Sequence, residues 1–518
     1  MRHIRTTDRA VGCSHYEKEA FMEEKNINEP KTVENIASDA ELLRHSEIRD
    51  GRFIRYYGKR TEIVIPNHVT VISEDAFRNN RRLTKVVLGA NVSEIQPDAF
   101  RGCTQLRQIT FPSGLREIGT NAFLGCTSLT TVLLPRTVVS IGDGCFRDCS
   151  ALRLVVLSAS LAHIGGYAFC GCESLEEITL PQNLQSIHRA TFFNCRSLKS
   201  IVVPDGVRTV GRYAFGRCTS LTELILPDAL THLGIGALSN CSSLRTFRVP
   251  ASVRFIGDDT FSCCESLETV EMPEEINYIG NSAFCACKSL KAVDLPQALT
   301  RIGHSAFLGC ASLKEAVIPS ATQDIASAAF AYCENLQRVE ISASLTEIED
   351  LMFTGCFALR EIVLPDSVEK IESGAFSNCA SLARVVLSSK LAQIDGKAFA
   401  GCVSLQEISL PASLKRIGKE AFAGCSALQT VIFPNVRFSM ERAVFVGCDA
   451  LKTVVVPDAY HVLRLRSAKF GISKNAHMIL HSELLRASIY AKLSDPSLPD
   501  ERRAELAKQL SDMNPNQK

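Results

Sequence analysis

The stretch LRQITFPSGLREIGTNAFLGCTS, residues 106–128, decides the fold because it returns along the chain with a period of 23. Its Phe recurs in the same position from Phe77 to Phe445, with Leu238 as the one exception. Three residues later a Cys stands in 16 units, and six residues later a Leu stands in all 17. Units that repeat without insertion or deletion predict a solenoid of stacked coils.

Each unit combines two local patterns. Apolar alternation at Ile109 and Phe111 predicts a strand with one buried face, and Pro112, which lacks an N–H, ends it. Leu115 and Ile118 then predict a second extended piece, and the A-F-x-x-C segment predicts a single helical turn. The unit is therefore an α/β repeat, and its apolar side chains become buried only when neighbouring coils stack.

Leu238 leaves a smaller side chain in a predicted stack of rings. A Phe at this position is expected to be tolerated if the slot has kept its room. If Leu238→Phe instead causes a large loss of stability, the packing around the slot has been rebuilt.

The signature I-G-x-x-A-F-x-x-C, together with a strand that ends in Pro, resembles the BspA-like leucine-rich repeats of the 23-residue subclass. This resemblance implies a curved, right-handed leucine-rich-repeat solenoid with a parallel β-sheet on one face. The lead-in DGRFIRYYGKRTEIVIP also resembles the hairpin that opens many members of the family. Its residues predict two strands, 53–57 and 62–65, around Gly58 and Lys59.

The remaining segments predict caps and extensions around the array. The first 49 residues hold 8 basic and 10 acidic side chains and few large apolar ones, which favours a mobile or weakly helical extension. The segment after the array predicts a helix from about Ala459 and a strand near His477 to Leu480, followed by two short helices. The expected organisation is a polar extension (1–49), a capping hairpin (50–66), 17 repeats (67–457), an atypical capping repeat (458–480) and a helical tail (481–518).

Charge and hydropathy exclude several classes of protein. The chain has 57 Lys plus Arg against 56 Asp plus Glu, so its net charge of +1 gives no electrostatic reason to bind nucleic acid. No apolar stretch approaches the roughly 18 residues that a membrane span needs, so no membrane insertion is expected. If Met1 is the true start, no secretory signal opens the chain, and a cytoplasmic location is expected. Display on the cell surface or secretion by a non-classical route is the alternative.

The aligned cysteines are predicted to be buried free thiols. Neighbouring coils would bring their Cα atoms within disulfide range, at about 5 Å, but a small polarisable side chain between buried Phe and Leu explains the position better. Zinc needs four converging ligands, commonly in paired C-x-x-C spacings, and this spacing does not occur. Cysteines outside the ladder, such as Cys170, Cys263 and Cys285, have no His close to them in the sequence. We therefore expect no metal and no cofactor.

The same regularity argues against an enzyme. A nucleophile with a His and an orienting acid would be expected to interrupt the repeat with a loop, and the 23-residue phase never slips. His163, His188, His232 and His304 lie near the turn after the Ile position, where exposed polar residues are routine. Phosphate-binding loops are absent from the sequence, since the glycines recur singly.

The strand face is the expected working surface. Stacked strands predict one continuous parallel sheet of about 80 Å, and the tenth residue after each Phe points outward from it, as far as Val455. Aliphatic residues fill most of these positions, although β propensity alone would also favour them. Arg248, Glu271 and Asp294 replace them in three consecutive units, which indicates either a localised binding patch or drift. The candidate protein-binding face consists of Val202, Ile225, Arg248, Glu271, Asp294, Val317, Glu340, Val363 and Val386.

Two classes of function follow. Many BspA-like proteins are surface adhesins, so the resemblance implies a non-catalytic, adhesion-like protein that binds a protein ligand. The alternative is an intracellular scaffold or adaptor, in which reduced cysteines are unremarkable. The identity of the partner and the oligomeric state stay open, as does the choice between the sheet face and the terminal extensions as the binding site.

Overall fold

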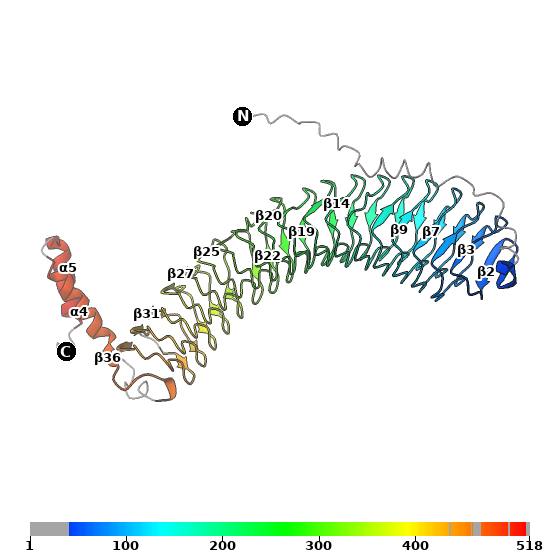
Figure 1. Cartoon of the computed structure of the whole chain (residues 1–518). Helices are drawn as coiled ribbons and strands as arrows, with labels where there is room; N and C mark the ends of the chain where they lie inside the picture. The colour runs from blue at the N-terminus through cyan, green and yellow to red at the C-terminus, as the bar shows by residue number, and fades with distance from the viewer. Residues whose placement is uncertain (1–40, 435–436, 457, 459–467, 496–497, 514–518) are drawn as a thin grey trace, which may run out of the picture.

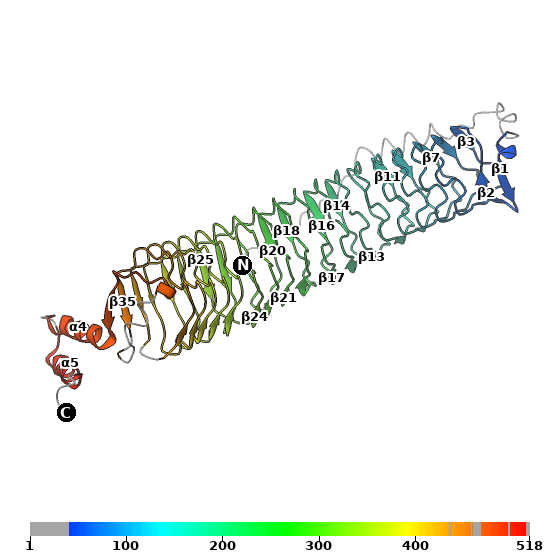
Figure 2. The same cartoon turned by 90° about the horizontal axis from the view of Figure 1, so that it is seen from below.

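The computed structural model describes residues 41–434, 437–456, 458, 468–495 and 498–513. Coils stack side by side into one curved array, so the predicted solenoid is confirmed (Figure 1). Strands β1 (Ser46–Arg49) and β2 (Arg52–Tyr56) close one end, and helices α4 (His481–Leu493) and α5 (Asp500–Asp512) follow the other (Figure 2).

One side of the array is built from parallel strands of three or four residues. They are the longer of the two strands in a coil, and we term them the long-strand ladder. Alternate residues of each strand face the core, as the period of two predicts. The ladder consists of β3 (Glu62–Val64), β5 (Lys85–Val87), β7 (Gln108–Thr110), β9 (Thr131–Leu133), β11 (Leu154–Val156), β14 (Ser200–Val202), β16 (Glu223–Ile225), β18 (Thr246–Arg248), β20 (Thr269–Glu271), β23 (Glu315–Ile318), β25 (Arg338–Ile341), β27 (Glu361–Val363), β29 (Arg384–Val386), β31 (Glu407–Ser409), β33 (Thr430–Ile432), β35 (Thr453–Val456) and β36 (His477–Leu480).

The prediction that this ladder forms one continuous sheet is wrong. Within the described residues its strands divide into seven separate sheets of two to four strands. Residues 177–180 contribute only an isolated bridge, Glu177 to Ser200, and residues 291–296 contribute no strand. Strands of three residues make few ladder bonds, so a small widening between coils is enough to open the pairing.

The second extended piece of each coil forms a two-residue strand, and these strands make the short-strand ladder. After β2 the members are β4 (Val71–Ile72), β6 (Glu94–Ile95), β8 (Glu117–Ile118), β10 (Ser140–Ile141), β12 (His163–Ile164), β13 (Ser186–Ile187), β15 (Thr209–Val210), β17 (His232–Leu233), β19 (Phe255–Ile256), β21 (Tyr278–Ile279), β22 (Arg301–Ile302), β24 (Asp324–Ile325), β26 (Glu347–Ile348), β28 (Lys370–Ile371), β30 (Gln393–Ile394), β32 (Arg416–Ile417) and β34 (Ser439–Met440). Each member from β4 to β32 buries the side chain at the Ile position, and Met440 of β34 is partly buried against the core.

The segment around each Phe is a pair of tight turns, so the predicted helical turn is wrong. In one coil, Asp98 and Gly102 have φ values of 56° and 71°, and these left-handed residues interrupt the run that a helix would need. The N–H groups of Asp98, Phe100 and Gly102 donate instead to carbonyls of the next coil, with N···O distances of 2.9, 2.7 and 2.7 Å. The same three bonds join every pair of neighbouring coils from Phe77 to Phe445, and we call this row the corner ladder.

Phe rings fill the core beside the corner ladder. Phe77 and Phe100 stack with centroids 4.8 Å apart and planes within 3°, and similar contacts continue to Phe215 and resume from Phe261 to Phe445. Leu238 separates the two stacks and is fully buried.

The coil that holds Leu238 also carries a Phe where other coils have a smaller side chain. Phe247, in β18, is buried and lies 5.1 Å from Phe261, the ring that would otherwise stack on a Phe at position 238. We infer that Phe247 occupies the room that Leu238 leaves.

The N-terminal cap differs from the predicted hairpin. Strand β1 pairs antiparallel with β2 across Asp50 and Gly51, whose φ values are 48° and 72°. Two successive positive φ values define the type I′ turn that suits a two-residue hairpin. The second predicted strand exists as β3, but it pairs in parallel with β5 and so belongs to the long-strand ladder. Phe53 of β2 stacks on Phe77 at 4.9 Å and extends the column of rings.

Other predictions about the ends have different outcomes. The strand predicted near His477 to Leu480 is present as β36, and the two tail helices are present as α4 and α5. Residues 1–40 of the predicted extension and the helix predicted from about Ala459 lie outside the described residues.

Candidate protein-binding face

The outward row consists of the side chains at the tenth position after each ladder Phe. Most of them are exposed because successive side chains of a strand point to opposite faces, and this face lies away from the core. In β14, Ile201 is 2% exposed, whereas the neighbouring Val202 is 59% exposed. Ile225, Val317 and Val363 repeat this behaviour, with exposed fractions of 48%, 46% and 52%. These four aliphatic side chains lie on one face of the array.

The other candidate residues differ from one another in their surroundings. Arg248, Glu271 and Glu340 are exposed on strands, as expected. Val386 is only half-buried rather than exposed. Asp294 is exposed, but it lies in the stretch without a strand, so the face is interrupted there.

Ion pairs neutralise two of the four charged candidate residues, Arg248 and Glu340. Arg248 pairs with Asp228 at 3.5 Å, and Arg338 pairs with Glu340 at 2.9 Å. In the described part of the chain, Glu271 and Asp294 have no such partner, although they occupy the same position of neighbouring coils. Two like charges side by side weaken strand pairing, which agrees with the open ladder at 291–296. The charged segment therefore divides the aliphatic row into two parts.

Exposed apolar surface continues nearer the N-terminus, beyond the candidate residues expected from the sequence. Leu133 and Val156 are paired neighbours in β9 and β11, and they are 42% and 40% exposed. Leu154, two residues before Val156, is 38% exposed. Both Leu133 and Val156 occupy the outward position that the repeat defines, so the signal was available in the sequence.

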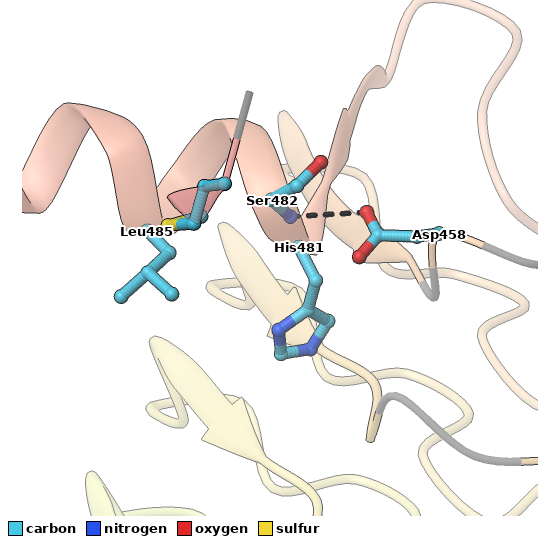
Figure 3. A pocket seen from close by; sticks show the side chains of 5 residues that line it. Asp458, His481, Ser482 and Leu485 are labelled. Carbon is cyan, nitrogen blue, oxygen red and sulfur yellow. Dashed lines mark hydrogen bonds between the residues drawn. The ribbon is translucent and has the colours of Figure 1, made fainter. Parts of the chain in front are cut away.

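The C-terminal elements close one end of this face. Val455, predicted to point outward, is only 1% exposed, because β36 pairs with β35 and leads directly into α4. His481 Nε2 lies 2.7 Å from the carbonyl oxygen of Phe433, and the N–H of Ser482 donates to Asp458 Oδ1 at 3.0 Å. Asp458, His481 and Ser482 line a pocket with Leu485 and Met513 (Figure 3). The pocket is thus a consequence of docking the tail against the last strands.

The ladder cysteines are buried and carry free thiols. Each Sγ lies within hydrogen-bond distance of the carbonyl of the ladder Phe in the preceding coil, as for Cys218 and Phe192 at 3.2 Å, except that Cys264 faces the carbonyl of Leu238. That carbonyl also accepts the backbone N–H of Cys195, so the thiol satisfies its second lone pair. Burial raises the pKa of Cys103 and Cys402 to about 12, which makes these thiols poor nucleophiles.

One Ser–His contact was missed by the sequence analysis. Ser186 Oγ lies 3.1 Å from His188 Nε2, and the ring centroid of His163 lies 5.0 Å from that of His188. Burial, followed by the charge of His163, lowers the pKa of His188. Asp143 raises the pKa of His188 through its charge, but no hydrogen bond joins these two side chains among the described residues; Asp143 Oδ1 accepts the N–H of Gly166 at 2.7 Å. An orienting hydrogen bond of the kind found in catalytic triads is therefore lacking among the residues described.

Across the described residues, no three His, Cys, Asp or Glu side chains are grouped so that they could hold a metal ion. None of the helices described combines the length and the apolar character that crossing a bilayer requires.

Known proteins similar to this chain are repeat proteins. The family model described as BspA type Leucine rich repeat region (6 copies) matches residues 46–172, 140–268, 254–382 and 346–475. No curated protein matches the chain.

Three solved structures resemble the array. A leucine-rich repeat protein from Bacteroides ovatus is 30% identical and has a TM-score of 0.58 over 71% of this chain and 87% of that one. The leucine-rich repeat protein of T. pallidum is 32% identical over 37% of this chain and 82% of that one, with a TM-score of 0.30. A leucine-rich cell surface protein from Faecalibacterium prausnitzii is 22% identical over 82% and 93%, with a TM-score of 0.31.

Proposed function

The chain belongs to the BspA-type leucine-rich repeat family, and on this premise we propose that it is a non-catalytic protein that binds a partner protein across its long-strand ladder. The observation that carries the proposal is the row of exposed aliphatic side chains, Val202, Ile225, Val317 and Val363. Exposed apolar residues gathered on one face typically mark an interaction surface.

Binding on such a surface spreads over many coils. Flat repeat surfaces gain affinity from several modest contacts around a few dominant ones. The two parts of the row, which lie on either side of Glu271 and Asp294, would contact apolar side chains of the partner. The two carboxylates between them would contact a basic or hydrogen-bond-donating group, because burying them against an apolar surface is unfavourable.

Charge substitutions on the row test this proposal. Partners are captured from cell extracts on the immobilised chain, identified after cross-linking, and titrated as purified proteins. The triple variant Val202→Asp, Val317→Asp and Val363→Asp is expected to weaken binding at least tenfold while the circular dichroism spectrum stays unchanged. The matched control carries Asp at Val139, Val403 and Val446 instead. These side chains are 43%, 43% and 47% exposed and do not belong to the outward row. Equal losses in both triple variants would contradict the proposal.

The biological setting of the proposed binding has two candidates. An adhesion-like role follows from the family, in which many members attach to proteins of other cells. An intracellular scaffold is favoured by the free ladder thiols, which suit a reducing compartment. Protease treatment of intact cells that make the protein, followed by immunoblotting for the repeats, separates the two: cleavage indicates surface display, whereas full protection indicates a scaffold.

A further inference from the structure

The edge of the array formed by the corner ladder carries a row of arginines. In the first coils, each arginine has a carboxylate of its own coil as its partner. Arg78 Nη1 lies 3.0 Å from Asp75 Oδ1, and Arg101 Nη1 lies 3.1 Å from Asp98 Oδ1. Both aspartates stand two residues before the ladder Phe, so this position supplies the neutralising charge.

Two later coils place a tyrosine in that position. Tyr167 and Tyr213 have φ values of 60° and 55°, a left-handed conformation that is unfavourable for a bulky side chain. The guanidinium carbons of Arg147 and Arg189 lie 5.5 and 5.4 Å from the Tyr167 ring centroid. An aromatic ring has thus replaced the carboxylate at this position. Arg147 still pairs with Asp148, at 3.5 Å between Nε and Oδ2, whereas the ring attracts Arg189 without neutralising it.

A second ring extends this arrangement. Phe193 and Tyr213 meet edge to face with centroids 6.3 Å apart, and the guanidinium carbon of Arg217 lies 5.8 Å from the Phe193 centroid. Glycines of the next coil make room for both rings. A Cβ on Gly236 would lie 2.2 Å from the Tyr213 ring, and one on Gly216 would lie 3.0 Å from the Phe193 ring. The rings are therefore held in place before any partner arrives.

Three arginines of this region are exposed: Arg189 and Arg217, which lie near the rings, and Arg212, which precedes Tyr213 in the sequence. Among the residues that the structure describes, no carboxylate lies within ion-pair distance of any of the three. Arg189 and Arg212 occupy the same position of successive coils, which stack about 5 Å apart. Two like charges at this spacing repel each other, so the surface favours an anionic group that contacts both.

We propose that this cationic ridge, formed by Tyr167, Arg189, Phe193, Arg212, Tyr213 and Arg217, binds an acidic segment of a partner protein. Guanidinium groups bind carboxylates in a bidentate geometry, and those held over a ring keep their outer N–H groups free for this contact. The half-buried rings offer apolar surface to the chain that carries the carboxylates. This surface is distinct from the long-strand ladder, so the two sites can be tested separately.

The length of the ridge favours a short acidic segment over a nucleic acid. Asp143 and Asp258 occupy the position of Arg189 and Arg212, two coils before and two coils after them. The five coil steps between the two aspartates span about 24 Å. A long polyanion that followed the row would meet carboxylates at both ends, whereas a few acidic residues fit between them.

Peptide titration of the full chain tests the proposal. The probe is a fluorescein-labelled peptide, acetyl-(Glu-Asp-Tyr)3-amide, and its uncharged twin is acetyl-(Gln-Asn-Tyr)3-amide. We expect the acidic peptide to bind, its affinity to fall with added salt, and the twin to bind at least tenfold more weakly. The variant Arg189→Gln, Arg212→Gln and Arg217→Gln is expected to lose at least tenfold in affinity for the acidic peptide.

The control variant carries the same charge change elsewhere. Arg107, Arg153 and Arg360 are exposed beside the long-strand ladder, and their replacement by Gln is expected to change affinity less than twofold. Circular dichroism checks that both variants fold. Tyr213→Asn, which suits the left-handed backbone, reports on the ring and is expected to weaken binding about threefold. The proposal is overturned if the ridge variant binds the acidic peptide like the unmodified chain, or if oligo(dT)12 binds the ridge more tightly than the peptide.

Discussion

Leu238→Phe is predicted to destabilise the array although it restores the repeat. Leu238 is fully buried and Phe247 is 4% exposed, so the coil has no spare room for a second ring at its corner. Phe247 lies 5.1 Å from Phe261, at the place where a new ring would need to stack. Overpacking of this kind costs about 1–3 kcal/mol.

The compensating change is Phe247→Leu. Alone, it removes three buried carbons, and at about 0.8 kcal/mol for each it is expected to cost about 2–3 kcal/mol. Combined with Leu238→Phe, it conserves the volume of the coil, and the double variant is expected to lie within about 1.5 kcal/mol of the unmodified chain. The coupling energy between the two sites is then about 3 kcal/mol.

Urea unfolding followed by circular dichroism measures these energies. Because a long array does not always unfold in two states, hydrogen exchange of amides in residues 238–260 provides the local measurement. Leu238→Met is the control, since a volume-conserving exchange costs less than about 1.5 kcal/mol. A neutral Leu238→Phe, or a double variant less stable than both single variants, would refute the reasoning.

Three further predictions concern the thiols. In urea unfolding, Cys218→Ser is expected to be more stable than Cys218→Ala, because the hydroxyl still donates to the Phe192 carbonyl and such a bond is worth about 1 kcal/mol. A more stable Ala variant would contradict this role of the thiol. Among the described residues, a thiol reagent without denaturant is expected to label Cys263 and Cys285 before the ladder cysteines, because these two are only half-buried. Mass spectrometry of labelled peptides that showed the ladder thiols reacting first would contradict this prediction. Burial raises the pKa of ladder thiols such as Cys149 above the unfolded value of about 9. Their contribution to the free energy of unfolding is therefore fully present below pH 9 and falls as the pH rises towards the folded pKa, by about 1.4 kcal/mol for each thiol by pH 10. Circular dichroism should show alkaline unfolding that moves to higher pH when several ladder cysteines are replaced by Ser.

The sequence predicted the parts of the fold that depend on side-chain burial. The strand alternation, the Phe and Leu positions and the buried cysteines follow from apolar periodicity, because each coil must hide the same side chains. The candidate face was predicted in the same way, and Val202, Ile225, Val317 and Val363 are exposed as expected. Val455 was missed because its cover comes from β36 and α4, which lie outside the repeat.

Features that depend on the backbone were harder to predict. The N–H of Phe100 donates to a carbonyl 22 residues later, so its local sequence could not distinguish an inter-coil bond from a helical one. The left-handed positions hold Asp98 and Gly102, which favour this conformation, but also Tyr167, which does not. Residue type alone therefore does not reveal these positions in the sequence. The N-terminal hairpin was predictable, since Asp50–Gly51 between two strands is a strong turn signal. A turn at Gly58 and Lys59 was expected instead, but the segment after it joins the long-strand ladder.

The corner ladder explains why one repeat can present different chemistry at each coil. Its three bonds join every coil pair from Phe77 to Phe445, whereas the long-strand ladder opens at several places. Backbone hydrogen bonds between the turns of neighbouring coils therefore hold the array together, and burial restricts most of the side chains in these turns. Outward residues such as Val202 and Glu271 do not contribute to this backbone connection, so exchanging them changes stability little. Because the framework tolerates such changes, surface chemistry can vary along the array independently of the fold.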